Sequence, residues 1–418
     1  MKKEEPGVLM PEKKSIYKEI TYSFEDPFFS PFEIQMGPQH PSTHGVLKLR
    51  LILEGEKIVD LEPVVGFLHR GVEKLAENMN YAQVLPLTDR LDYISAMNNN
   101  TGYALVVERL LGIEPPPRGK YLRSMVCELA RIASHLLWLA THALDIGAMT
   151  VFLYCFRERE MILNFFEKIC GARLTVSYPR IGGVRLDVEE SVLEEIYNFI
   201  PYMYEKIEEY EGLLSENRIW LDRTKGVGVI TGEEALAYGL TGPSLRGSGI
   251  PYDVRKHFPY DAYPEVEFEV PVGKNGDTYD RYWVRLQEMR QSLRIVKQCI
   301  EKMPEGPVCA ELSPDLDMPL YKRAYRAEAF GESTLIAFLN EGAQIVPKGE
   351  LYSAVEGAKG ELGFYLVSDG SGKPYRLHIR APSFIHISAL KKLSQGHFLA
   401  DLVAIIGTLD IVMGECDR

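Results

Sequence analysis

The sequence lacks several features that would assign a function directly. Its six cysteines are scattered without a Cys-x-x-Cys pair, so local spacing builds no zinc or iron–sulfur site. No apolar run reaches the roughly 18 residues that cross a bilayer. No basic block is interleaved with aromatic residues, and the net charge of −12 argues against nucleic acid as a partner. We therefore expect reduced thiols and a chain that is soluble in the cytoplasm or peripheral on the cytoplasmic side of a membrane.

Nucleotide-binding loops are also missing. The glycine-rich stretches Arg223–Gly228 and Leu245–Gly249 do not complete Gly-x-Gly-x-x-Gly. Neither leads into the Lys-Ser/Thr of a phosphate-binding loop. We therefore expect that this chain alone binds no nucleotide, flavin or cluster.

The length predicts several subregions, because 418 residues exceed the roughly 250–300 that one hydrophobic core serves. Residues 1–30 mix charge, proline and aromatic residues without a period, and are expected to form an extension. We predict a small β domain over 31–65, a helix-bundle core over 66–305 and a mixed α/β region over 306–418. The predicted fold class is α+β.

A stiff loop with two imidazoles, Gly37–Gly45, lies in the predicted β domain. Pro38 and Pro41 restrict its backbone, and it carries His40 and His44, whose side chains titrate near neutrality. We expect a functional loop in which His40 stabilises the local structure. The alternative is a connector whose histidines only cap backbone groups.

Hydrophobic periodicity predicts the elements that follow and precede this loop. Strands are predicted over 32–36, 47–53, 57–61 and within 350–387, and helices from 68, from 88, and over 103–111, 121–144, 149–169, 189–216, 279–303 and 398–407. Thr88, which follows Pro86, is the expected N-cap of the second helix, so Tyr93 is expected to be helical.

One polar stripe runs along the long helix predicted over about 121–144. Its members, at steps of three, four and seven, are Glu128, Arg131, His135, His142 and Asp145. Leucine and alanine occupy the other sides, so we expect a buried helix with paired charges and shifted pKa values. A solvated face is the alternative. A buried stripe of this kind is a candidate for proton-coupled work.

Seven motifs follow one another over about residues 33–418. They are Gly-Pro-Gln-His-Pro-Ser-Thr-His-Gly at 37–45, Leu-His-Arg-Gly-Val-Glu-Lys-Leu at 68–75, Asp-Arg-Leu-Asp-Tyr at 89–93, Thr-His-Ala-Leu-Asp-Ile-Gly-Ala-Met-Thr at 141–150, Leu-Arg-Gly-Ser-Gly at 245–249, Leu-Val-Ser-Asp-Gly at 366–370 and Asp-Ile-Val-Met-Gly-Glu-Cys-Asp-Arg at 410–418. In this order they resemble the D-type subunit, also called the 49-kilodalton-type subunit, of respiratory complex I. The resemblance implies a fold like that of the hydrogenase large subunit, with a small N-terminal sheet and a central helix bundle.

The large subunit of nickel–iron hydrogenases, to which that family is similar, holds its metal with an N-terminal and a C-terminal Cys-x-x-Cys. Asp92 and Ser95 stand at the first pair of positions, and Val412 and Glu415 at the second. Two carboxylates, a hydroxyl and an isopropyl group cannot replace four thiolates around soft nickel. We therefore expect a pocket without metal, which by the resemblance receives a quinone headgroup.

The resemblance also implies the site residues. His44 and Tyr93 would contact the headgroup, because an imidazole and a phenol can donate hydrogen bonds and protons to quinone oxygens. Asp145 would pair with His44 and favour its charged form. The other implied residues are Val412, Arg90, Asp92, Ser95 and Met97 in the pocket lining, and Arg70 and Thr175 near the cluster of a partner.

Some of these residues have other interpretations. Tyr93 could be a core tyrosine bonded to a carbonyl, and Arg70 and Arg90 could form structural ion pairs. At the position of Thr175 the family often carries a histidine near the terminal cluster. The loss of this titrating donor would lower the potential of the cluster and remove its pH dependence. We therefore expect a low-potential acceptor such as a menaquinone type.

The resemblance implies a quinone-site subunit in the peripheral arm of a proton-translocating NADH:quinone oxidoreductase. The expected partners are the iron–sulfur subunit with the terminal cluster (B type) and subunits of the C, H and I types. Flavin and iron–sulfur clusters are expected on partner chains. This chain is expected to be peripheral on the cytoplasmic side of the cell inner membrane. A rival is a related quinone reductase fed by ferredoxin or another reduced carrier. An active hydrogenase is disfavoured by the missing Cys-x-x-Cys pairs, and a purely structural subunit by the polar stripe.

Overall fold

The computed structural model of this chain describes residues 31–311 and 346–418. The predicted extension over 1–30 lies outside these residues, as does the part of the predicted C-terminal region over 312–345.

A small antiparallel sheet begins the described chain, with β1 (Phe32–Met36), β2 (Lys48–Glu54) and β3 (Lys57–Val64) in that order. Buried and half-buried residues alternate along β2, as its leucine pattern predicts. The register places Leu51 opposite Ile34 on β1 and Leu61 on β3. The two-histidine loop joins β1 to β2, so the sheet fixes both of its ends.

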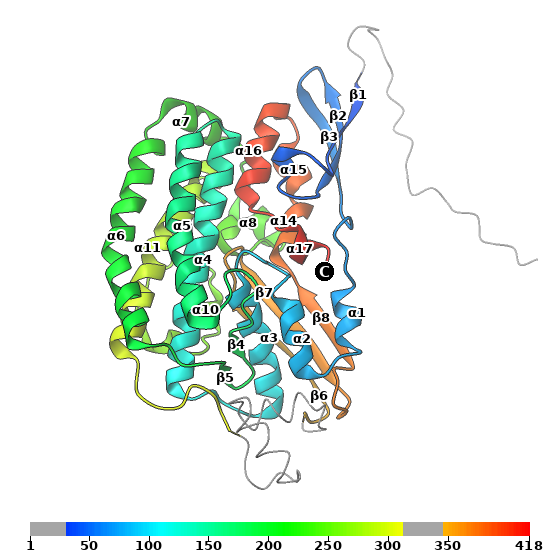
Figure 1. Cartoon of the computed structure of the whole chain (residues 1–418). Coiled ribbons are helices and arrows are strands. Elements are labelled where there is room, and N and C mark those ends of the chain that lie inside the picture. Colours follow the sequence, from blue (N-terminus) through cyan, green and yellow to red (C-terminus); the bar gives the residue numbers. More distant parts are fainter. Residues whose placement is uncertain (1–30, 312–345) are drawn as a thin grey trace, which may run out of the picture.

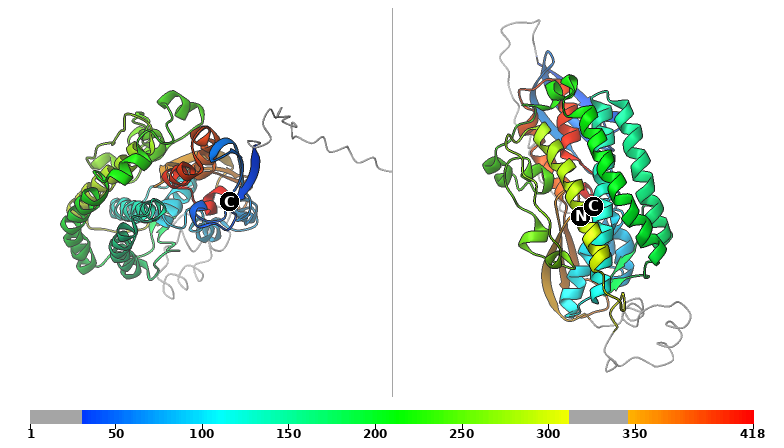
Figure 2. Two further views of the ribbon diagram at one scale, coloured as in Figure 1. Left: turned by 90° about the horizontal axis from the view of Figure 1, so that it is seen from above. Right: turned by 90° about the vertical axis from the view of Figure 1, so that its left-hand side faces the viewer.

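Four long helices form the middle of the chain. They are α4 (Pro117–Asp145), α5 (Met149–Cys170), α6 (Glu190–Leu214) and α11 (Thr278–Lys302). They run side by side along one flank of the molecule (Figures 1 and 2), and α4 packs against α5, α11 and α3 (Ala96–Leu111). Gly171 ends α5 in the left-handed conformation at φ 77°, as predicted.

The C-terminal part folds back onto both regions. The antiparallel strands β6 (Gly349–Glu356), β7 (Glu361–Ser368) and β8 (Arg376–Arg380) form a sheet on α3. The following helices are α14 (Pro382–Ser388), α15 (Leu390–Ser394), α16 (Leu399–Leu409) and α17 (Met413–Cys416). Leu390 and Ile405 share a hydrophobic cluster with Leu49 and Leu51 of β2. The last helices therefore complete the core of the first sheet, and the C terminus lies beside α17 (Figure 1).

Short elements connect these parts. They are α1 (Val72–Ala76), α2 (Tyr81–Thr88), β4 (Pro179–Arg180), β5 (Gly183–Val184), α7 (Arg218–Thr224), α8 (Gly232–Ala237), α9 (Gly242–Arg246), α10 (Val254–His257) and 3-10 turns at Pro41–Thr43 and Tyr263–Glu265. None of the described helices combines the length and the apolar character needed to span a bilayer.

The predicted α+β class is confirmed, with its small N-terminal sheet, helical middle and mixed C-terminal region. The domain boundaries stay a prediction. The prediction that a helix begins at Thr88 is wrong, because Thr88 is the last residue of α2. Asn80 starts that helix in a capping box with Gln83, and Pro86 lies inside it.

A second prediction is also wrong, because the strand pattern over 350–387 does not run to its end. Pro382 begins helix α14 at its first position, where a missing N–H is harmless. The alternation of apolar residues after Arg380 therefore belongs to a short helix rather than to a strand.

Candidate functional site

The two-histidine loop brings His44 to the end of α4. His44 Nε2 lies 2.6 Å from Asp145 Oδ2, and the two side chains are only 13% and 10% exposed. His44 has φ 48°, a left-handed conformation that follows the 3-10 turn. His40 caps that turn, because its Nδ1 accepts a hydrogen bond from Ser42 N at 3.2 Å, so its predicted stabilising role is confirmed. The structure thus contains the expected His44–Asp145 pair.

Tyr93 lies in the turn between α2 and α3, not on a helix as predicted. Its side chain is 39% exposed, and among the described residues no hydrogen-bond partner of its hydroxyl is found, which speaks against a core tyrosine tied to a carbonyl. Burial and then the charge of Asp92 raise the pKa of Tyr93, while Lys359 and Arg70 oppose them. The phenol therefore stays protonated at neutral pH.

Helix α17 lies between the two loops that carry His44 and Tyr93. A Cβ on Gly45 would lie 3.4 Å from Met413 Cγ, so the histidine loop packs directly on α17. On the other side, a Cβ on Gly414 would lie 2.5 Å from Leu91 O and 3.0 Å from Tyr93 Cδ1. The C-terminal helix therefore sets the relative position of the two candidate groups.

The two arginines near Tyr93 bind main-chain oxygens. Arg70 donates to Gly414 O at 2.5 Å, and Arg90 donates to Pro86 O at 2.6 Å. Neither forms an ion pair within residues 31–311 and 346–418, so the ion-pair alternative finds no support there. Burial lowers the pKa of Arg70. Arg70 therefore ties its segment to α17, next to Tyr93.

The four positions that the resemblance aligns with hydrogenase cysteines are buried. Asp92 pairs with Lys359 Nζ at 3.3 Å, and Ser95 Oγ accepts from Asn98 at 2.7 Å. Val412 contributes only its isopropyl group to the interior, and its backbone N–H donates to a serine. Glu415 accepts from the backbone of α14, and burial together with Asp92 raises its pKa to about 7.

This donor set does not fit a nickel–iron centre. Thiolates are absent from all four positions, and the ammonium of Lys359 lies beside Asp92, where it would repel a metal cation. Within the described chain, histidine, cysteine, aspartate and glutamate side chains form no group of three or more that could hold a metal ion.

Met97 and Tyr93 line a small crevice together with Arg173, Leu174 and Val176. The crevice has a volume of about 10 Å³, which is too small for a six-membered ring. Thr175 is exposed on the segment that borders it. At this crevice, the described residues therefore do not enclose enough space for a ring.

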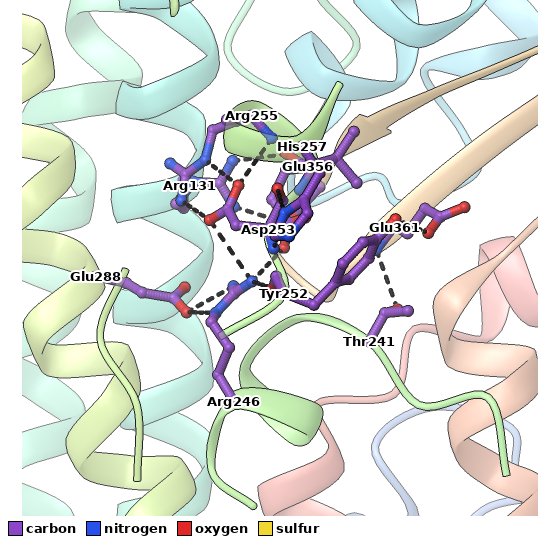
Figure 3. A network of polar contacts seen from close by, with 12 residues as sticks. Arg131, Thr241, Arg246, Tyr252, Asp253, Arg255, His257, Glu288, Glu356 and Glu361 are labelled. Atoms are coloured by element: carbon purple, nitrogen blue, oxygen red, sulfur yellow. Dashed lines mark hydrogen bonds and ion pairs between the residues drawn. The ribbon is translucent and has the colours of Figure 1, made fainter. Parts of the chain in front are cut away.

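The polar stripe of α4 is buried from Glu128 to His142, so the solvated-face alternative is wrong. Burial opposes the charge of Glu128, but Arg131 and Arg255, which pair with it at 3.1 and 3.0 Å, outweigh burial and lower its pKa to about 2. His135 Nε2 lies 2.9 Å from Glu288 on α11. Figure 3 shows part of this ion network between α4, α11 and the strand β6. Most partners of the stripe thus come from other elements.

The stripe is interrupted at His142. Its ring stacks on Trp138 with centroids 5.3 Å apart, and within the described chain neither of its nitrogens has a hydrogen-bond partner. Burial keeps the pKa of His142 well below its usual value. Over the described residues, the hydrogen-bonded groups around Glu128 therefore do not continue along α4 to Asp145.

Three residues of the site were missed by the sequence interpretation: Lys359, Asp410 and Gly414. Lys359 lies in a glycine-rich turn between two strands, a position typical of solvated lysines. Asp410 follows α16 in the left-handed conformation, at φ 53°. Asp410 and Gly414 both lie in the C-terminal motif, but only Gly414 carried a signal, because glycine permits close approach of another chain segment.

Comparisons with known proteins agree with the resemblance. A family model described as "Respiratory-chain NADH dehydrogenase, 49 Kd subunit" matches residues 145–418. The chain is 66% identical to the second D-type NADH-quinone oxidoreductase subunit of Thermodesulfovibrio yellowstonii, over 93% of this chain and 97% of that protein. It is 52% identical to the D-type NADH-quinone oxidoreductase subunit of Geobacter metallireducens, over 92% and 98%. It is 50% identical to the mitochondrial NADH-ubiquinone oxidoreductase 49 kDa subunit of Neurospora crassa, over 93% and 80%.

Proposed function

This chain belongs to the family of the 49 kDa subunit of respiratory-chain NADH dehydrogenase, and we propose that it forms the quinone-headgroup site of a proton-translocating NADH:quinone oxidoreductase. The names of its relatives support the reaction, since they are subunits of NADH-quinone or NADH-ubiquinone oxidoreductases. The observation that carries the proposal is the His44–Asp145 pair at 2.6 Å, separated from Tyr93 by one short helix.

The two side chains can supply what a quinone needs as it is reduced. Each carbonyl oxygen gains negative charge with the electrons and then takes up a proton, so each needs a donor. Tyr93 has a protonated phenol, and the Asp145 carboxylate holds the His44 imidazole at 2.6 Å. Transfer of one proton from the phenol and one from a protonated His44 leaves a phenolate at Tyr93 and a net negative charge at the His44–Asp145 pair. We propose that this local rearrangement is passed toward the membrane arm.

The small crevice at Tyr93 supports a site that a second chain completes. The crevice there holds only about 10 Å³, while a ring must be enclosed on both faces. We propose that the iron–sulfur subunit of the B type covers it and brings the terminal cluster, with subunits of the C, H and I types nearby and flavin further upstream. The chain would lie on the cytoplasmic side of the inner membrane.

Thr175 lies on the exposed segment that borders this crevice, which supports its placement near the partner's cluster. A hydroxyl does not titrate near neutrality, whereas a histidine does. We propose a cluster of low, pH-independent potential and an acceptor of the menaquinone type.

The test is the substitution Tyr93→Phe in the assembled complex, with Tyr238→Phe as the control because both side chains are 39% exposed. Quinone reduction by NADH should collapse in the first variant only, while NADH:ferricyanide reduction, which bypasses the quinone site, should survive in both. Retained quinone reduction in Tyr93→Phe and in Tyr93→Ala would refute the site. Quinone reduction by the same preparation is also measured with reduced ferredoxin in place of NADH. This measurement distinguishes NADH from ferredoxin as the electron donor.

A further inference from the structure

A buried lysine, Lys359, contacts Asp92, the residue before Tyr93 of the candidate site. It lies in the turn between β6 and β7, yet its side chain is only 1% exposed. Its Nζ donates to Ser134 Oγ on α4 at 2.5 Å, and pairs with Asp92 Oδ2 at 3.3 Å and Asp410 Oδ2 at 3.6 Å. One ammonium thus contacts three separate elements.

The turn that carries Lys359 is fixed on two sides. Gly357 and Gly360 exchange backbone hydrogen bonds of 2.7 and 3.2 Å. Arg131 on α4 donates to Gly357 O at 2.8 Å, and Gly360 packs so closely on Thr241 that a Cβ would lie 2.5 Å from its Oγ1. Because these contacts fix the backbone of the turn, they restrict the positions that the ammonium of Lys359 can occupy.

The surroundings of the ammonium are rich in carboxylates. Asp92 and Asp410 pair with it directly, and Glu415 contributes to its electrostatic environment. Burial opposes the charge of Lys359, but Asp410 and Asp92 outweigh burial and raise its pKa. Without this cation, two buried carboxylates would lose the ammonium that pairs with both of them, which is unfavourable in a region shielded from water.

The two carboxylates belong to the segments that set the site. Asp92 immediately precedes Tyr93 in the turn after α2, and Asp410 lies between α16 and α17, the helix that contacts Tyr93 and the histidine loop. We propose that Lys359 is a positioning residue of the quinone site: its ammonium joins the Tyr93 turn to the C-terminal segment and balances their carboxylates. This inference rests on the proposed function.

The test compares Lys359→Met with the double variant Lys359→Met/Asp410→Asn, which removes one positive and one negative charge together. The control is Lys391→Met, because this lysine is 53% exposed and also pairs with one carboxylate, Asp60, at 2.6 Å. Assembled complexes are assayed for NADH:ferricyanide and NADH:quinone reduction, with separate kcat and KM for quinone. Tyr93→Phe is measured alongside.

Lys359→Met should keep ferricyanide reduction and lose about ten-fold in kcat for quinone. The double variant should regain most of that loss, and Lys391→Met should match the wild type. Unchanged quinone kcat in Lys359→Met, or an assembled double variant that regains nothing, would overturn the inference. If neither variant assembles, the role of Lys359 is limited to folding, and this result would also overturn the inference. Full quinone activity in Tyr93→Phe would instead refute the proposed function itself.

Discussion

The substitution Asp145→Asn tests the proposed proton chemistry most sharply. It keeps the shape of the side chain at the end of α4 but removes the charge that faces His44 Nε2 at 2.6 Å. A hydrogen bond to a charged group contributes roughly 1.5–3 kcal/mol. Because both side chains are nearly buried, solvent screening leaves most of this intact. If the interaction acts at the protonation step, its loss lowers quinone reduction about 10- to 150-fold, at roughly 1.4 kcal/mol per factor of ten.

The assay compares NADH:quinone with NADH:ferricyanide reduction in membranes that contain the assembled complex. Asp187→Asn is the matched control, because Asp187 also forms an ion pair, with Arg118 at 2.9 Å, but is half exposed and far along the chain from the site residues. Only Asp145→Asn should lose quinone reduction, and both should keep ferricyanide reduction. Equal quinone rates in Asp145→Asn and wild type would refute the reasoning.

Three further predictions concern stability, packing and potential. Burial lowers the pKa of His135 from 6.5 to about 4, so below pH 6.5 the unfolded chain binds a proton that the folded chain does not, and stability falls by about 2 kcal/mol at pH 5. His135→Gln, which keeps a donor for Glu288, should flatten thermal unfolding of the full chain against pH between 6.5 and 4.5; an unchanged slope contradicts this. Gly414→Ala should displace Tyr93, whose Cδ1 would lie 3.0 Å from the new Cβ, and lower quinone but not ferricyanide reduction; normal quinone kinetics would show that the contact is unimportant. Thr175→His should raise the potential of the partner's cluster and make it pH-dependent, and a redox titration identical to wild type would count against its placement.

The hydrophobic periodicity of the sequence was sufficient to predict the long helices and strands. The leucines of β2 alternate because one face is buried, and α5 ends at Gly171 where the apolar pattern stops. Local signals failed where two of them competed. Pro86 and Thr88 suggested a helix start, but the capping box at Asn80 had already begun a helix that tolerates the proline.

The site could be predicted in part because its residues lie in recognisable motifs. The structure brings His44 and Asp145 together and leaves Tyr93 partly exposed beside α17, and their contact with a headgroup stays a prediction. The stripe on α4 was expected to be buried, and it is, but periodicity could not show that Glu288 would pair with His135 or that His142 would have no partner within the described chain. Partners from other helices depend on tertiary packing, which one helix does not encode.

Lys359 shows why such a residue cannot be found by reading along the chain. Its neighbours, Gly357 to Gly360, are typical of a solvated hairpin turn, and a lysine there is normally exposed. Its burial follows from the packing of the β6–β7 turn against α4, and its partners Asp92 and Asp410 lie in distant segments. Each carboxylate alone is also ordinary. In the folded chain, the last helices return to the first sheet. Only there does an unpaired carboxylate at Asp92 or Asp410 become costly, and this cost makes the lysine necessary.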